Sequence, residues 1–101
     1  MKSNFQKILQ QAELYKPEMV RFLRDLIAIP GESCQEEDVI RCIKKEMEAV
    51  GFDAVKIDPL GNILGAIGNG PRLLAFDAQI DTVKVGDLAL WNYDPYKGFE
   101  D

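Results

Sequence analysis

Two carboxylates and one amide follow a short apolar run, at Asp77, Gln79 and Asp81 after residues 73–76. Side chains alternate along an extended chain, so residues 77, 79 and 81 share one face if the strand conformation continues. Ligands of open α/β sheets bind just outside the carboxyl ends of the strands. These three side chains could therefore line a ligand or metal site. The alternative is that Asp77 and Asp81 cap turns, and residue chemistry alone favours that alternative.

Histidine is absent from the 101 residues, which excludes every histidine-based triad, dyad or metal site within this chain. The two cysteines are Cys34 and Cys42. Eight positions along one helix separate their Cα atoms by about 12 Å, too far for a disulfide, so we expect both to stay reduced. Cys34 lies near a predicted helix N-terminus, but neighbouring acids oppose a lowered thiol pKa and no histidine can act as its base. A structural cysteine is the favoured interpretation.

The composition is that of one small globular domain or a piece of a larger one, with 47% hydrophobic and 29% charged residues. The net charge of −5 argues against binding to nucleic acid or to an anionic membrane. The first residues lack the apolar core of a signal peptide, and no run approaches the ~18 apolar residues of a spanning helix. We therefore expect a soluble cytoplasmic protein with a thin core.

The first half of the chain predicts three helices. Ser3 and Gln6 have the form of a capping box ahead of apolar residues at helical spacing in the range 5–15. Pro17 is placed to open a second helix, which ends before Pro30.

The third predicted helix starts at a second capping box, Ser33 with Glu36, and ends at Gly51, where Phe52 is placed for the hydrophobic contact of a C-terminal cap. Its predicted buried stripe consists of Ile40, Ile43, Met47 and Val50.

The second half predicts strands at 54–57 and 63–67, each followed by a turn. Residues 73–76 form a continuous apolar run, typical of a strand covered on both faces. The predicted fold is therefore a layered α/β unit, three helices followed by strands of a mixed sheet. From residue 82 onward the chain is aromatic and turn-rich, and we expect this tail to pack against structure beyond the chain.

The block at 76–83 resembles the first motif, His-x-Asp after a buried strand, of the zinc-dependent amidohydrolase and peptidase family. That family includes acetylornithine deacetylase, succinyl-diaminopimelate desuccinylase and the carboxypeptidase G type enzymes, and the branch of selenium-metabolism hydrolases is the most similar. Other segments of the chain resemble further motifs of the family and follow them in the family's order. They are residues 22–30 with Glu32 and Ser33, Gly51-Phe52, Asp58 with Gly61-Asn62, Gly70-Pro71, and Trp91 with Asp94-Pro95-Tyr96 and Gly98.

The resemblance implies that residues 1–101 are the N-terminal portion of a metallohydrolase catalytic domain, with the C-terminal part and the lid or dimerisation domain absent. The family uses two zinc or cobalt ions to hydrolyse small N-acyl amino acids or peptides. Gln79 stands where the family has its first histidine ligand, and Asp81 stands where an aspartate orients that histidine. A neutral amide is a poor zinc ligand. We therefore expect no metal cofactor on this chain.

The resulting hypothesis is an N-terminal fragment or degenerate member of a metal-dependent amide hydrolase family, inactive as this chain. One alternative is a non-catalytic interaction module that associates with a related full-length subunit. A second alternative is that the complete molecule remains an enzyme in which another ligand replaces Gln79. The expected partners are the missing C-terminal part or a related subunit, and neither nucleic acid nor a membrane.

Overall fold

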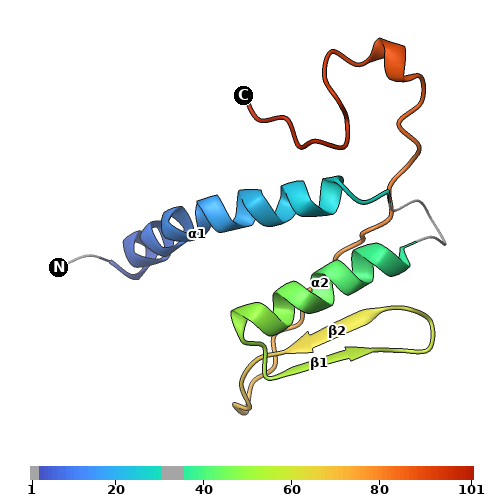
Figure 1. Cartoon of the computed structure of the whole chain (residues 1–101). Coiled ribbons are helices and arrows are strands. Elements are labelled where there is room, and N and C mark those ends of the chain that lie inside the picture. The colour runs from blue at the N-terminus through green and yellow to red at the C-terminus, as the bar shows by residue number, and fades with distance from the viewer. Residues whose placement is uncertain (1–2, 31–35) are drawn as a thin grey trace.

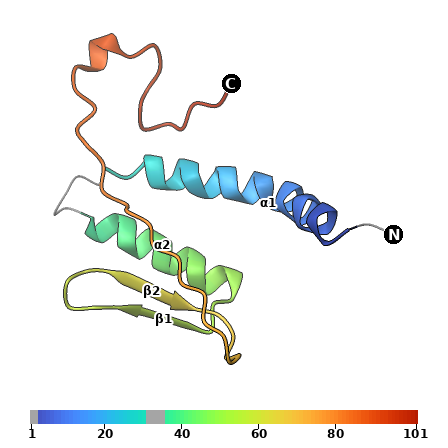
Figure 2. The same ribbon diagram turned by 180° about the vertical axis from the view of Figure 1, so that it is seen from behind.

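The computed structural model describes residues 3–30 and 36–101. It contains the helices α1 (Asn4–Ile27) and α2 (Glu37–Val50), the strands β1 (Ala54–Ile57) and β2 (Ile63–Ala66), and a 3-10 helix, η1 (Leu88–Leu90). Helix α2 contacts α1 on one side and the β1–β2 hairpin on the other (Figures 1 and 2). Among the described residues, no helix is long and apolar enough to cross a membrane.

Helix α1 begins at the predicted capping box. The Ser3 hydroxyl accepts from the Gln6 N–H at 3.2 Å, and the Ser3 N–H donates to the Gln6 side chain at 2.9 Å. Contrary to the prediction of two helices, α1 runs through Pro17 without a break. The missing N–H of proline removes one backbone hydrogen bond of the helix. Because the ring fixes φ at a helical value, the turns on either side continue the helix. The helix ends ahead of Pro30, as predicted.

Helix α2 ends as the sequence predicted. Gly51 adopts a φ of 92°, and its N–H donates to the Glu48 carbonyl at 3.2 Å. The Phe52 N–H donates to the Met47 carbonyl at 3.0 Å, which completes a Schellman motif. At the other end, Glu36 is the N-cap and makes no side-chain capping bond. The predicted cap Ser33 lies outside the described residues, as does Cys34.

The small core lies on α2. Its buried residues are Val39, Ile40 and Ile43, so the predicted stripe is right at Ile40 and Ile43. It is wrong at Val50, which is 64% exposed. Met47 is half-buried.

The hairpin pairs β1 with β2 in antiparallel register, with Val55 opposite Gly65 and Ile57 opposite Ile63. Paired residues point to the same face, so these four residues share one side of the sheet. A Cβ added at Gly65 would meet Phe52 and Met47, which shows that this side faces the end of α2. Glycine at position 65 allows that close approach.

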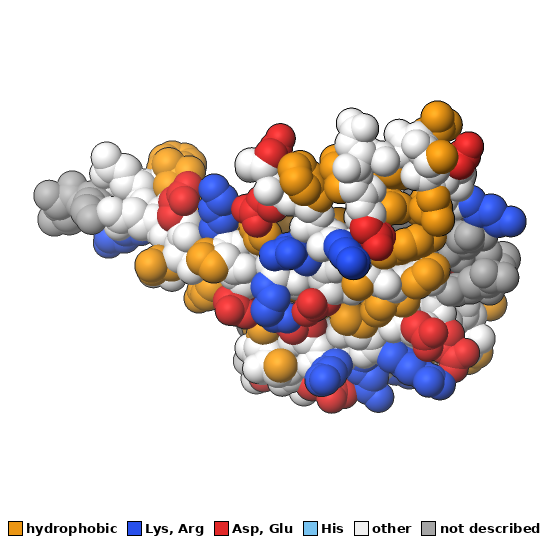
Figure 3. Space-filling view, turned by 45° about the horizontal axis from the view of Figure 1, so that its top comes forward, with side chains coloured by type: hydrophobic (Ala, Val, Ile, Leu, Met, Phe, Trp, Pro, Cys, Tyr) orange, Lys and Arg blue, Asp and Glu red, His pale blue; other side chains and the backbone are white. Residues whose placement is uncertain are grey.

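Residues 73–76 do not form the predicted strand, and the sheet is two-stranded and antiparallel rather than mixed. Leu73, Leu74 and Phe76 are 95%, 78% and 90% exposed. A strand needs a neighbouring strand for its backbone groups, and the described part of the chain provides none here. The radius of gyration is 16.7 Å, against about 13 Å for a compact domain of this length. Figure 3 shows hydrophobic side chains at the surface, along the projecting α1 and over the body of the molecule.

Candidate functional site

Gln79 and Asp81 lie together, as their spacing predicted. The amide nitrogen of Gln79 donates a hydrogen bond to Oδ1 of Asp81. Gln79 is exposed, whereas Asp81 and the intervening Ile80 are half-buried. Asp77 is exposed and makes no side-chain hydrogen bond among the described residues. The segment therefore brings two of the three predicted site residues together.

The Gln79–Asp81 pair does not fit a metal centre. A zinc site in a protein needs three or four nitrogen, sulfur or carboxylate ligands. Across residues 3–30 and 36–101, no group of three His, Cys, Asp or Glu side chains lies close enough to hold an ion. The Gln79 amide directs its donor nitrogen at Asp81, so the Asp81 carboxylate is already engaged by a neighbouring side chain. We derive no catalytic step from this arrangement.

A charge cluster that the sequence analysis did not identify joins the two helices. The Arg21 guanidinium donates to Glu18 at 3.0 Å and to Asp25 at 2.7 Å, both on α1, and to Glu46 of α2 at 2.7 Å. The hydrogen bond to Glu18, followed by the charge of Glu46, raises the pKa of Arg21. The spacing of Glu18, Arg21 and Asp25 on one helix is a signal that could have revealed part of this cluster.

Cys42 lies close to the same cluster. Burial, and then the carboxylates of Asp25 and Glu46, raise the pKa of the Cys42 thiol. A raised pKa keeps the thiol protonated, and the thiolate is the reactive form of cysteine. Cys42 therefore has the character of a structural residue.

The tail of the chain returns to α1 and docks on it through Gly98. This residue is buried, with a φ of 62°, and a Cβ added there would lie 2.7 Å from Cγ of Arg24. The tail is also held to itself, because Tyr93 stacks on Phe99 at 4.4 Å between ring centroids. Trp91 packs edge-on to Tyr93 and donates its indole N–H to the Val85 carbonyl. Three aromatic side chains of the tail thus pack on one another, although the sequence predicted packing against structure beyond the chain.

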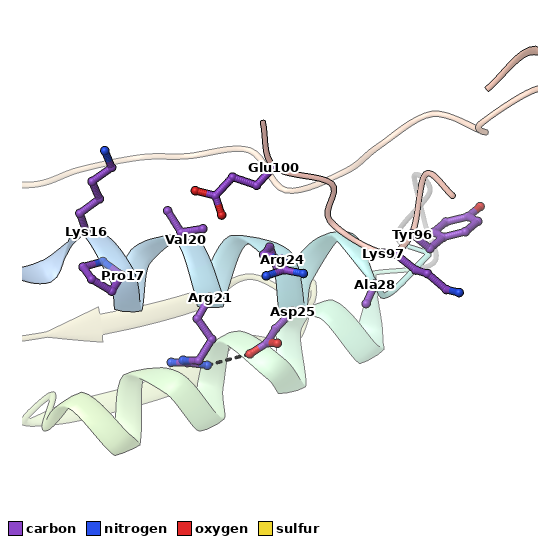
Figure 4. Close-up of a pocket in the computed structure, with 10 residues that line it drawn as sticks. All are labelled: Lys16, Pro17, Val20, Arg21, Arg24, Asp25, Ala28, Tyr96, Lys97 and Glu100. Carbon is purple, nitrogen blue, oxygen red and sulfur yellow. Dashed lines mark hydrogen bonds and ion pairs between the residues drawn. The ribbon is translucent and has the colours of Figure 1, made fainter. Parts of the chain in front are cut away.

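An open groove of about 700 Å³ lies between α1 and this tail (Figure 4). Lys16 and Arg24 on α1 and Lys97 on the tail line it, together with Arg21, Asp25 and Glu100. None of the residues that line the groove is a serine, cysteine or histidine, so it offers neither a Ser–His nor a Cys–His pair. The sequence analysis did not predict this groove, because only the return of the tail creates it.

The chain is similar to segments of several longer proteins. It is 58% identical over 96 residues, 95% of its length, to the uncharacterized protein YgeY of Escherichia coli K12. It is 30% identical over 83 residues to succinyl-diaminopimelate desuccinylase of Cereibacter sphaeroides, and 35% identical over 66 residues to LysW-lysine hydrolase of Deinococcus radiodurans. These matches cover 78% and 65% of the chain, respectively.

The chain spans only a part of each of these relatives, 24% of YgeY, 22% of the desuccinylase and 18% of the LysW-lysine hydrolase. No family model matches the sequence. No solved structure matches it either. Two of the relatives carry the names of hydrolases, so the similarity supports a hydrolase relationship for this segment.

Proposed function

We propose that this chain is the N-terminal portion of the catalytic domain of a metal-dependent hydrolase of amide or peptide bonds, and that it is not catalytic by itself. The observation that carries the proposal is the alignment of 95% of the chain with 24% of YgeY, together with the weaker similarity to a desuccinylase and a LysW-lysine hydrolase. The proposed substrates of the complete enzyme are small N-acyl amino acids or peptides.

The lack of activity in the isolated chain is proposed from the chemistry of position 79. Hydrolysis of an amide requires an activated water and a polarised carbonyl, which metal hydrolases obtain from bound ions. Gln79 is neutral, and its amide donates to Asp81 instead of presenting an imidazole nitrogen. The chain also has no histidine that could take over as ligand or base.

The small core supports the same proposal. Only Val39, Ile40 and Ile43 are buried hydrophobic residues within the described ranges. Catalysis needs groups held rigidly in place. A segment with so little packing is unsuited to hold a reacting geometry without further structure around it.

A chimera tests the proposal. The matched segment of Escherichia coli YgeY is replaced by this chain, in the Gln79 form and as the Gln79→His variant. We expect the histidine form to bind more zinc per protein, measured by atomic absorption, and to hydrolyse N-acyl amino acids faster, with N-succinyl-diaminopimelate among the substrates. Gln10→His, at an exposed position on α1, is the matched control and should change neither quantity.

Two outcomes would contradict the proposal. The first is equal zinc content and activity in the Gln79 and Gln79→His chimeras. The second is chelator-sensitive hydrolysis, or tight stoichiometric zinc binding in calorimetry, by the isolated chain.

The alternative function is a non-catalytic module that associates with a related full-length subunit. Exposed apolar side chains favour association with another protein surface, and Leu73 and Phe76 of this chain are 95% and 90% exposed. A stand-alone module should be a soluble monomer that melts cooperatively. A piece of a catalytic domain should aggregate or lack a cooperative transition when it is alone.

A further inference from the structure

We propose that Asn69 is a site of spontaneous covalent modification, at which the side-chain amide becomes a carboxylate through a cyclic imide formed with the backbone of Gly70. Both reacting groups belong to the chain, and water is the second reactant. The inference is independent of the proposed hydrolase function, since it requires neither a metal ion nor a bound substrate.

The reaction is an intramolecular attack followed by hydrolysis. The backbone nitrogen of Gly70 loses its proton and forms a bond to Cγ of Asn69, while the C–N bond of the side-chain amide breaks and releases ammonia. The product is a succinimide ring. Water then opens the ring at either of its carbonyl groups, which leaves an aspartate or an isoaspartate. The sum is a hydrolysis that consumes a water molecule and releases ammonia, with no oxidation or reduction.

The turn after β2 leaves both reacting groups free. Asn69 and Gly70 are exposed and belong to neither a helix nor a strand. Within the described residues, the Asn69 side chain makes no hydrogen bond and the Gly70 N–H donates none. A Cβ added at Gly70 would meet no atom within 4 Å. Attack requires the two atoms to approach to about 3–3.5 Å, and an unbonded, uncrowded pair can rotate into that geometry.

The hydrogen bonds that hold the hairpin stop just before the reacting pair. The Gly68 N–H donates to Oδ2 of Asp53 at 2.6 Å, and the Asp53 N–H donates to the Ala66 carbonyl at 2.9 Å. Gly68 itself has a φ of 82°, which glycine adopts at little cost. Rotation at Asn69 and Gly70 therefore breaks none of these contacts, and the reaction does not require the hairpin to open.

The remaining asparagines of the chain are placed less favourably for this reaction. Asn62 is also exposed, but its side-chain nitrogen donates to Oδ2 of Asp58 at 3.0 Å and its N–H donates to Oδ1 at 2.9 Å. The residue after it is the β-branched Ile63, which crowds the attacking nitrogen. Asn4 and Asn92 each precede an aromatic residue. Asn69 alone precedes a glycine.

The modification would change both the charge and the backbone of the chain. Each conversion adds a negative charge to a chain whose net charge is −5. The isoaspartate product also adds a methylene to the main chain between β2 and residues 73–76. Because the reaction is irreversible and needs no enzyme, we expect the modified form to accumulate with the age of the protein.

Peptide mapping of the YgeY chimera after incubation at mildly alkaline pH tests the proposal. The chimera is the sample because the isolated chain is expected to lack a cooperative transition. We expect Asn69 to convert at the rate measured in a synthetic peptide of residues 65–73, with aspartate and isoaspartate products separated by chromatography and identified by mass spectrometry. Gly70→Ala should slow the conversion about tenfold, because a Cβ hinders the attacking nitrogen and narrows its range of φ.

Leu60→Asn supplies a matched control for the effect of the structure. It creates a second Asn–Gly pair, at a position that is 89% exposed in the hairpin turn. There, the Gly61 N–H donates to the Asp58 carbonyl at 3.0 Å, so the attacking nitrogen is engaged. We expect this pair to convert at least about threefold more slowly than Asn69, because a hydrogen bond must break first.

Three results would overturn the proposal. An Asn69 that stays intact in the chimera while the synthetic peptide converts means that the turn is held or covered. A rate that Gly70→Ala leaves unchanged means that the Gly70 nitrogen is not the attacking group. Equal rates at the Leu60→Asn position and at Asn69 mean that the free backbone of this turn does not control the reaction. The hydrolase activity of the chimera bears on none of these outcomes.

Discussion

Replacement of Gly65 by alanine should destabilise the packing of the hairpin against α2. A Cβ at this position would lie 2.6 Å from Cδ2 and 2.7 Å from Cε2 of Phe52, and 3.0 Å from the sulfur of Met47. Carbon atoms pack best at about 3.5–4.0 Å, so the Phe52 ring would have to retreat by about 1 Å. Phe52 is held by the Schellman motif that ends α2, which limits its freedom to move.

The expected size of the effect follows from two opposing contributions. Overpacking of a fitted contact costs about 1–3 kcal/mol. Replacing a glycine inside a strand by alanine returns about 0.5–1 kcal/mol of conformational entropy. The net loss for Gly65→Ala is therefore on the order of 1–2 kcal/mol. Since m grows with the surface exposed on unfolding, the expected fall in the unfolding midpoint is this loss divided by the m value of the parent protein.

The assay is urea unfolding of the YgeY chimera followed by circular dichroism, because the isolated chain is expected to lack a cooperative transition. Gly70→Ala in the same chimera is the matched control. Gly70 has open space where a Cβ would be placed, and its φ is not left-handed. Gly70→Ala should therefore be neutral or slightly stabilising. Phe52→Leu, which shortens the obstructing side chain, should reduce the cost of Gly65→Ala in a double-mutant cycle. Equal stability of Gly65→Ala and Gly70→Ala would refute the packing described for the hairpin.

Three further predictions, also measured in the YgeY chimera, concern the caps and charges. Gly51→Ala places a Cβ in open space but at a φ of 92°, so it should cost about 1 kcal/mol in urea unfolding, and Gly51→Asn should cost less. Hydrogen bonds from the side chain and backbone of Asn62 lower the pKa of Asp58, so this carboxylate stabilises the hairpin above its ordinary pKa of about 3.9. The stabilisation by Asp58 should disappear as the pH falls through the lowered pKa of this carboxyl. NMR titration of Asp58 should give a midpoint below about 3.9, and the stability of Asp58→Ala should lack this pH dependence. Arg21→Met should loosen α1 from α2 and lower the melting temperature, less so in 1 M salt, whereas Arg41→Met removes only a contact within α2 and should have a smaller effect.

Local sequence signals predicted several elements accurately. The capping box at Ser3, the end of α2 at Gly51, and the strand at 54–57 all agree with the structure. Each depends on contacts within a few residues, such as the hydrogen bonds between Ser3 and Gln6. Two signals were misleading. Pro17 predicted a helix start, but its φ is also compatible with a helix interior. The apolar run at 73–76 predicted a buried strand, but burial and pairing require neighbours distant in the sequence.

Local sequence likewise predicted only part of the candidate site. The spacing of Gln79 and Asp81 predicted that they would share a face, and they form a hydrogen bond. The ion pair between Arg21 and Glu46 and the packing of Gly98 on Arg24 were not predicted, because each joins segments far apart in the chain. No periodicity or motif encodes such a pairing.

By itself, the sequence determined the local elements and the chemistry at position 79, because capping, turn geometry and the identity of a ligand atom are properties of a few adjacent residues. The tertiary structure decided which surfaces are covered. It places α2 between α1 and the hairpin and leaves residues 73–76 in solvent. Whether a segment is buried depends on what packs against it, and its own apolar residues indicate only that burial would be favourable.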